Sequence, residues 1–263
     1  MALRSALINA MTNAARKAAR GLLRDFNEVE HLQVSKKGPA DFVSAADRRA
    51  EKTLHAELSK LRPDFGFIME EGGRIEAKDG KHYWVIDPLD GTTNFLHAIP
   101  HFAISIGVLR ENELIAGIVL DVVRDELFWA EKGAGAFHND RRLRVSVRRK
   151  LPDAVIATGI PFHGREGHDR FRQELATVMP EVAGIRRFGA AALDLAYVAA
   201  GRYEGFWERG LSIWDIAAGI MLVREAGGIV TDLKGGATML ESGEILAAND
   251  VLHGPLLKLL GRK

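Results

Sequence analysis

The strongest constraint in the sequence is a short acidic turn that directly follows an apolar strand. Residues 82–86 form an apolar aromatic run that is typical of a buried strand. Asp87 follows this run, and Pro88 is expected to end the strand because proline has no N–H to donate. Gly91 then opens a turn into the next element. Asp87 and Asp90 lie three residues apart, so their carboxylates repel each other unless a positive charge lies between them.

A hard divalent cation is one answer to this repulsion. Mg2+ binds oxygen ligands, and the backbone carbonyl of Leu89 supplies a further oxygen beside the two carboxylates. The small residues of the turn also allow backbone N–H groups to face an anion. The alternative is an acidic capping turn without a ligand, because Asp-Gly turns are common.

The bulk composition describes an ordinary globular protein. The chain has 263 residues, of which 47% are hydrophobic and 27% charged, enough for one large or two small domains. The 36 basic and 35 acidic residues leave a net charge of +1, so the total charge implies no polyelectrolyte partner. The sequence contains no cysteine, which excludes disulfides, a thiolate nucleophile and a zinc-thiolate site.

The N-terminal segment bears on where in the cell the protein is located. No apolar run reaches the ~18 residues that cross a bilayer, and the segment lacks the apolar block of a secretory signal. Up to Arg24 it contains basic residues and no acid, which fits either a transit peptide or an amphipathic helix. Apolar residues recur on one face from Leu3 to Leu22, which favours the helix. A cytoplasmic protein without membrane contact is expected.

Three further acids stand at the ends of expected elements. Residues 35–41 are polar and contain Gly-Pro, which predicts an exposed loop that carries Lys36. A helix is expected from about residue 44 to 58, with Asp47 in its first turn, where the helix dipole alone would favour an acid. Residues 65–69 predict a short strand that ends in Glu70 and Glu71.

The rest of the chain predicts sheets with intervening helices. Antiparallel strands are predicted at residues 104–109, 114–122 and 126–130. The glycine-rich residues 133–138 do not match a phosphate-binding loop, because they lack its third glycine. A boundary is expected near residue 145, between an N-terminal subdomain (1–145) and a C-terminal one (146–263). Strands and helices alternate in the second half, which indicates an α/β layer packing. Asp215 is expected at a helix start, where it also suits an N-cap.

Taken together, these segments resemble the inositol monophosphatase family of Mg2+-dependent, lithium-sensitive sugar phosphatases. The resemblance covers essentially the whole chain. Its motifs are Asp41-Phe42-Val43-Ser44-Ala45-Ala46-Asp47, Met69-Glu70-Glu71, Trp84-Val85-Ile86-Asp87-Pro88-Leu89-Asp90-Gly91-Thr92-Thr93-Asn94-Phe95, Trp214-Asp215-Ile216-Ala217-Ala218-Gly219 and Val223-Arg224-Glu225-Ala226-Gly227-Gly228.

The resemblance implies a five-layer αβαβα sandwich of the α/β (α+β) class, a homodimer, and two to three Mg2+ ions per subunit. Glu70, Asp87 and the Leu89 carbonyl would hold the first ion. Asp87, Asp90 and Asp215 would hold the second, and a third, weaker ion would be held mostly by water and Glu70.

The resemblance also implies roles in substrate binding and catalysis. Asp47 and Thr92 would orient and deprotonate the attacking water, next to Glu70. Apart from the resemblance, charge balance leaves an excess of negative charge once a phosphate binds beside two Mg2+ and four carboxylates, and a third Mg2+, helix N-termini or Lys36 could neutralise it. Positions that contact the substrate would be the Gly91 and Thr92 amides at the phosphate, and the Gly189, Ala190 and Ala191 backbone, Glu208 and Asp215 at the alcohol.

Two departures concern substrate contacts. The family's usual Gly-Glu-Glu-Ser is Met69-Glu70-Glu71-Gly72 here, and a common Ser or Thr is Ala190. The predicted reaction is hydrolysis of a small polyol phosphate, most directly myo-inositol monophosphate. Fructose 1,6-bisphosphate, histidinol phosphate and a nucleotide 3′-phosphate are alternatives. A regulatory role that contacts nucleic acid or RNA polymerase is another, with the basic residues 141–150 as its candidate surface.

Overall fold

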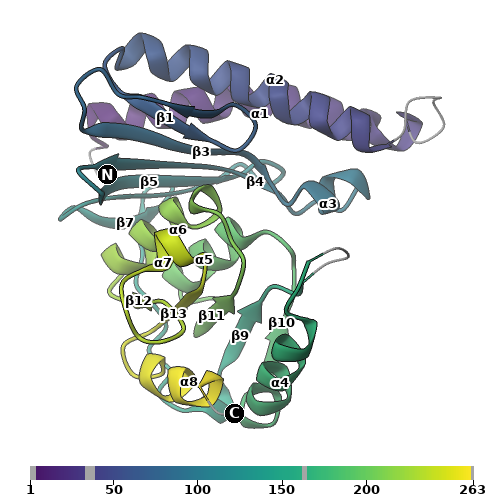
Figure 1. The fold of residues 1–263 in the computed structure, drawn as a ribbon, viewed down its shortest axis with the longest axis vertical. Helices are drawn as coiled ribbons and strands as arrows, with labels where there is room; N and C mark the ends of the chain where they lie inside the picture. Colours follow the sequence, from purple (N-terminus) through teal and green to yellow (C-terminus); the bar gives the residue numbers. More distant parts are fainter. Residues whose placement is uncertain (1–3, 33–38, 162–164, 262–263) are drawn as a thin grey trace.

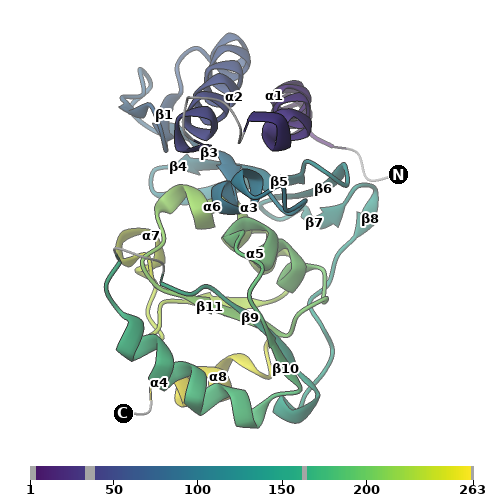
Figure 2. The same cartoon turned by 90° about the vertical axis from the view of Figure 1, so that its right-hand side faces the viewer.

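The computed structural model describes residues 4–32, 39–161 and 165–261, arranged in five stacked layers (Figure 1). A pair of long helices covers the outer face of a large sheet, and a second helix pair separates this sheet from a smaller one (Figure 2). A third helix pair covers the far face of the smaller sheet. The order is therefore αβαβα, as the resemblance implied.

The first two layers are formed by the N-terminal half of the chain. The outer helices are α1 (Ala6–Leu32) and α2 (Pro39–Leu61). The large sheet has the strand order β2-β1-β3-β4-β5-β6-β7-β8, in which only the β1–β3 pair is parallel. Its strands are β1 (Gly66–Met69), β2 (Gly73–Ile75), β3 (His82–Asp90), β4 (Ala103–Arg110), β5 (Glu113–Asp121), β6 (Glu126–Glu131), β7 (Gly135–His138) and β8 (Arg141–Arg142), with the short helix α3 (Thr92–Leu96) after β3.

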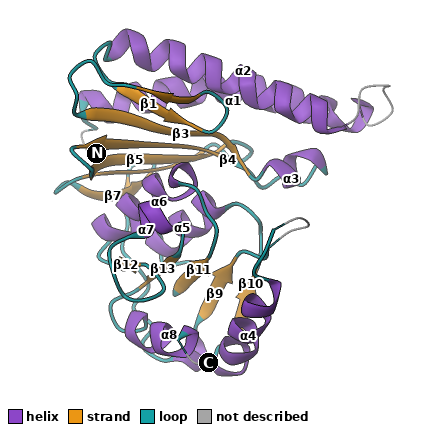
Figure 3. Ribbon diagram, in the orientation of Figure 1, coloured by secondary structure: helices purple, strands orange, loops and turns teal. Residues whose placement is uncertain are grey.

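The other three layers come from the C-terminal half, as the alternating helices and strands of Figure 3 show. The smaller sheet has the order β10-β9-β11-β13-β12, and its β10, β9 and β11 are parallel. Its strands are β9 (Val155–Thr158), β10 (Gly184–Arg186), β11 (Gly205–Glu208), β12 (Ile229–Thr231) and β13 (Ile245–Ala248). The helices are α4 (His168–Val178), α5 (Ala191–Ala199), α6 (Ile213–Glu225), α7 (Met239–Ser242) and α8 (His253–Leu260), with short 3-10 turns at Leu151–Asp153 and Met179–Glu181.

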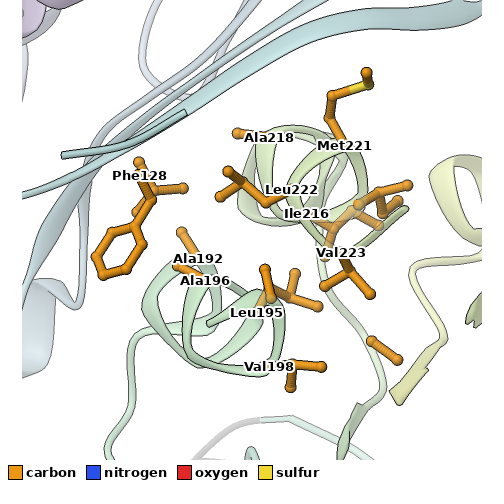
Figure 4. Packing of buried hydrophobic residues seen from close by; sticks show 14 of the residues in the cluster. Phe128, Ala192, Leu195, Ala196, Val198, Ile216, Ala218, Met221, Leu222 and Val223 are labelled. Atoms are coloured by element: carbon orange, nitrogen blue, oxygen red, sulfur yellow. The ribbon is translucent and has the colours of Figure 1, made fainter. Parts of the chain in front are cut away.

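Three hydrophobic cores hold the layers together. One lies between α1 and α2 and the large sheet, one surrounds α5 and α6 between the two sheets, and one lies between the smaller sheet and α4 and α8. Strand alternation distributes side chains between them: Ile104 and Ile106 of β4 face α1 and α2, whereas Ala103 faces the middle layer. In the middle layer, small residues of α5 and α6 allow the helices to approach closely, and Leu195 lies among them (Figure 4). A Cβ on Gly219 of α6 would lie 2.4 Å from a Leu195 methyl carbon, so α6 needs glycine there.

Two expected boundaries are wrong. Strand β3 does not end at Pro88 but continues to Asp90. The ladder to β4 pairs Asp87 with Ser105 and Asp90 with Ala103, so β3 contains one extra residue, a bulge that tolerates a proline without an N–H. Helix α2 begins at Pro39, because the first helical turn tolerates proline. Asp47 therefore lies in the helix interior, and the dipole of the first turn does not explain it.

The two sheets divide between residues 66–142 and 155–248, on either side of the predicted boundary near residue 145. Helices α5 and α6 nevertheless pack against the N-terminal sheet as well as their own, within one continuous core. The division into two subdomains stays a prediction.

Candidate functional site

The site is built around Asp87, in the bulged end of β3. Its Oδ1 accepts the N–H of Leu89 at 2.8 Å, which fixes the carboxyl, 2% exposed, on the bulge. Burial is the largest cause that raises the pKa of Asp87, followed by the charges of Glu70, which directly follows β1, and of Asp90 and Asp215. Buried carboxylates this close repel one another when all are ionised, so a proton or a cation is needed to neutralise part of their charge. The structure thus brings together acids that are 17 and 128 residues apart in sequence from Asp87.

Asp90 and Asp215 are each oriented by backbone amides at a helix N-terminus. Oδ2 of Asp90 accepts the N–H of Ala192 at 2.8 Å, at the start of α5. Oδ2 of Asp215 accepts the N–H of Ser212 at 2.7 Å, as half of a capping box at the start of α6. Asp215 therefore lies at the start of α6 as expected, but the N-cap residue is Ser212, and Asp215 is the third helical residue, whose side chain reaches back to the Ser212 amide. This contact leaves the second carboxylate oxygen of Asp215 for another partner.

The turn after Asp90 contains Gly91 and Thr92, whose amides are predicted to bind phosphate oxygens. Gly91 has φ +94°, and a Cβ there would lie 2.9 Å from the His101 carbonyl oxygen, so this position requires glycine. Oγ1 of Thr92 donates to the Leu89 carbonyl at 3.0 Å. This bond connects the residue predicted to orient water with the carbonyl predicted to bind metal.

Asp47 reaches the same region from α2. Its carboxyl is 5% exposed, and Oδ1 has no hydrogen-bond partner among the described residues. Burial, followed by the charges of Glu70, Glu71 and Glu51, raises the pKa of Asp47 to about 8. A buried carboxyl with an orphan oxygen is poised to bind a ligand that the protein alone does not supply.

Glu208 approaches from the smaller sheet, at the end of β11. Burial and the charge of Asp215 raise the pKa of its carboxyl to about 8, against the opposing effects of Arg187 and Arg165. Its sequence neighbour Arg209 pairs with Glu174 at 2.8 Å and with Glu244, which removes Arg209 as an explanation for Glu208.

The three backbone positions before and at the start of α5 differ in role. Gly189 has φ +81°, Ala190 is the N-cap of α5, and Ala191 is the first residue of this helix, directly before the Ala192 amide that donates to Asp90. The predicted contacts of these three positions with the substrate stay predictions. Lys36 lies outside the described residues.

The acids of the site fit a divalent cation by their chemistry. Burial is the largest cause that raises the pKa of Asp87, Asp90 and Asp215, and neighbouring carboxylates raise the pKa of Asp87 and Asp90 further. Among the described residues, no three Asp, Glu or His side chains already surround one point as ligands of a single ion. Binding would therefore need the carboxylates to turn toward the ion, with the Leu89 carbonyl as an additional oxygen.

The pKa shifts predict how pH acts on the metal-free protein. In the unfolded chain Asp47 and Glu208 lose their protons near their ordinary values of 3.8 and 4.5, but in the folded chain only near 8. Between these pH values the folded state binds more protons, so its stability falls as pH rises from about 4 to about 8. We expect the Tm of metal-free protein to fall over this range, and added Mg2+ to raise it most at pH 8. A Tm unaffected by Mg2+ and EDTA at pH 8 would contradict a cation site.

Two residues of the site were missed by the sequence reasoning. Nδ2 of Asn94 donates to the His101 and Phe188 carbonyls, each at 2.8 Å, and so connects α3 to the loop before α5. Oε2 of Glu51 accepts the N–H of Glu71 at 2.9 Å and so holds the turn after Glu70. Asn94 stands within a quoted motif, and one helical turn separates Glu51 from Asp47, but neither pattern indicates these long-range partners.

Gly72, a departure from the family pattern, is explained by Glu51. A Cβ at Gly72 would lie 2.8 Å from Oε1 of Glu51 and 2.9 Å from the terminal methyl of Met69. The glycine therefore leaves room for the buried carboxyl that holds this turn.

Comparison with known proteins agrees with the fold. The chain is 59% identical to an inositol-1-monophosphatase of Mesorhizobium japonicum, over 97% of this chain and 96% of that protein. It is 48% identical to a protein of Pseudomonas aeruginosa named Nus factor SuhB, over 95% of this chain and 94% of that protein. The crystal structure of the extragenic suppressor protein suhB of Bartonella henselae superposes with a TM-score of 0.92 at 56% identity, over 98% of this chain and 99% of that one.

These findings first define a class of protein. The chain is a phosphatase with the αβαβα fold, so the predicted fold and enzyme class are confirmed. It belongs to the inositol monophosphatase family, whose sequence pattern matches residues 3–262.

Proposed function

We propose that this chain hydrolyses the phosphate monoester of a small polyol, with myo-inositol 1-phosphate as the first substrate and two to three Mg2+ ions per subunit. The buried carboxyl of Asp87, close to the charges of Glu70, Asp90 and Asp215, is the observation that carries the proposal, because these acids repel one another unless a cation neutralises their charge. The name of the Mesorhizobium relative supports this substrate.

Each group of residues has a distinct task in the proposed reaction. Bound Mg2+ would stabilise the charge on the phosphate oxygens and make a nearby water more acidic. Asp47, with Thr92, would orient this water and accept its proton, and Gly91 and Thr92 amides would bind phosphate oxygens. The residues that would hold the ions are Glu70, Asp87, Asp90, Asp215 and the carbonyl of Leu89.

Phosphate release from a panel of esters tests the proposal, with and without Mg2+. The panel contains myo-inositol 1-phosphate, fructose 1,6-bisphosphate, histidinol phosphate, a nucleotide 3′-phosphate and p-nitrophenyl phosphate. Mg2+-dependent release that is fastest with inositol 1-phosphate is expected. Release that is independent of Mg2+ would contradict the proposed metal, and a faster ester would replace the proposed substrate.

Glu208 separates recognition of the alcohol from the chemistry at phosphorus. Its carboxylate can accept hydrogen bonds from sugar hydroxyls, and a charge-assisted hydrogen bond is worth about 1.5–3 kcal/mol. We expect Glu208→Gln to lower kcat/KM for inositol 1-phosphate about 10- to 150-fold and to leave p-nitrophenyl phosphate nearly unchanged. Equal losses on both esters would assign Glu208 to the scaffold.

A role in transcription complexes is a second candidate, favoured by the relatives named Nus factor SuhB. In addition to the basic residues 141–150, a cavity of about 490 Å³ between α1 and α2 has a basic lining. Its cationic residues are Lys17, Arg24, Arg49, Lys52 and Lys60, beside Asp25 and Glu57. Salt-sensitive RNA binding by a catalytically inactive variant would support this candidate.

The remaining expectations stay predictions. They are a homodimer, a cytoplasmic location and inhibition by lithium. None of the described helices combines the length and the apolar character needed to span a bilayer.

A further inference from the structure

Gly159 lies directly against the carboxylate of Glu208. A Cβ built on Gly159 would lie 1.8 Å from Cδ of Glu208 and 1.9 and 2.1 Å from its two carboxylate oxygens. Carbon atoms do not approach so closely, so any side chain at position 159 must displace this carboxylate. The two residues are 49 positions apart in the sequence.

The parallel pairing of β9 and β11 creates this contact. Thr158, the last residue of β9, is in register with Trp207, next to Glu208. The buried hydroxyl of Thr158 donates to the Trp207 carbonyl at 2.9 Å, which fixes the ends of both strands relative to each other. The Glu208 side chain then crosses the chain where β9 ends, over the bare Cα of Gly159.

This arrangement opens a cavity beside the site. The cavity has a volume of about 260 Å³, and both Gly159 and Glu208 line it, together with Phe171 and Trp207. Arg209, which also lines it, is paired with Glu174 and Glu244. Because Gly159 has no side chain, there is room for the Glu208 carboxylate where β9 ends, and Glu208 lines a cavity of small-molecule size.

We propose that Gly159 is a positioning residue for alcohol recognition: its lack of a side chain places the Glu208 carboxylate where it can bind the hydroxyl groups of the substrate. The inference rests on the proposed function, since it assigns Glu208 to the polyol. It adds that the size of the side chain at position 159 determines whether the Glu208 carboxylate can bind a polyol.

Gly159→Ala is the test. The carboxylate has to move by at least about 1 Å to restore a contact of 3.0 Å, and a displacement of this size can cost about 100-fold in rate. We expect kcat/KM for inositol 1-phosphate to fall about 10- to 150-fold, as for Glu208→Gln, and turnover of p-nitrophenyl phosphate to change little. Gly254→Ala is the matched control, because a Cβ at Gly254 of α8 meets no atom within 4 Å.

A double-mutant cycle shows whether Gly159 acts through Glu208. Glu208→Ala removes the carboxylate that the new methyl group would displace, so Gly159→Ala should have no further effect on kcat/KM in that background. A further loss in that background, an equal loss on both esters, or unchanged kinetics of the single variant would each overturn the proposal.

The crystal structure of Gly159→Ala gives a readout that does not depend on activity. A Glu208 carboxylate displaced by about 1 Å or more, with the strand ends in place, is expected. A carboxylate that keeps its position would overturn the inference even if the proposed substrate is wrong. Conversely, a displaced carboxylate in an enzyme that never hydrolyses polyol phosphates would leave Gly159 as the positioning residue and refute the proposed substrate alone.

Discussion

Asp90→Asn is expected to lower kcat at least about 1,000-fold on every phosphate monoester, although the protein still folds. The Asp90 carboxylate accepts the Ala192 N–H at 2.8 Å, and the amide oxygen of Asn can retain this bond. The substitution therefore removes a negative charge from a side chain that is only 8% exposed and leaves the packing in place. Losing the stabilisation that the bound cation gives to charge in the transition state costs several kcal/mol, and each 1.4 kcal/mol lowers the rate about tenfold.

The measurement is kcat over a range of Mg2+ concentrations, with folding checked by circular dichroism and thermal melting. Asp194→Asn is the matched control, because Asp194 is a buried acid on α5 near Asp90 but outside the predicted ligand set. The control should retain most of its turnover. Near-normal turnover of Asp90→Asn would refute Asp90 as a metal ligand.

Much of the fold follows from local patterns. Alternating residues of β4 face different layers: Ile104 and Val108 pack toward the outer helices, whereas a Cβ on Gly107 would lie 3.0 Å from the Ala217 Cβ of α6, so the glycine lets α6 pack closely on the sheet. The expected strand ranges 104–109, 114–122 and 126–130 agree with β4, β5 and β6 to within one residue, because their hydrophobic pattern is strong. The acids at strand ends could also be predicted from the sequence, because each acid directly follows its strand along the chain.

What the sequence did not indicate depends on partners far along the chain. Pro88 remains within β3 because Asp90 still pairs with Ala103 beyond the bulge, and this pairing is a tertiary property. The contact between Gly159 and Glu208 arises only when β9 and β11 lie in register. Glycine at position 159 has no local signature, because its requirement comes from a side chain on another strand.

Asp47→Asn is the second substitution that we expect to lower kcat strongly. Asp47 is the proposed proton acceptor, and general base catalysis contributes about 100- to 10,000-fold. The substitution keeps the size of the side chain in a site that is 5% exposed, but an amide cannot accept the proton of water. We expect kcat to fall by about this range with KM little changed, because the proposed phosphate amides and metal ligands are untouched.

Stability gives an independent check on this variant. Since the pKa of Asp47 is raised to about 8, the folded wild type loses stability as pH rises from about 4 toward 8, and Asn removes this contribution. The metal-free variant should therefore melt at a higher temperature than wild type at pH 8, but not at pH 4. A variant that shows this shift in Tm yet retains normal kcat would prove that the substitution acts at the buried site and that Asp47 is not the base. The proton would then have to pass to another group near the water, and Thr92, whose hydroxyl donates to the Leu89 carbonyl, would be the next residue to replace.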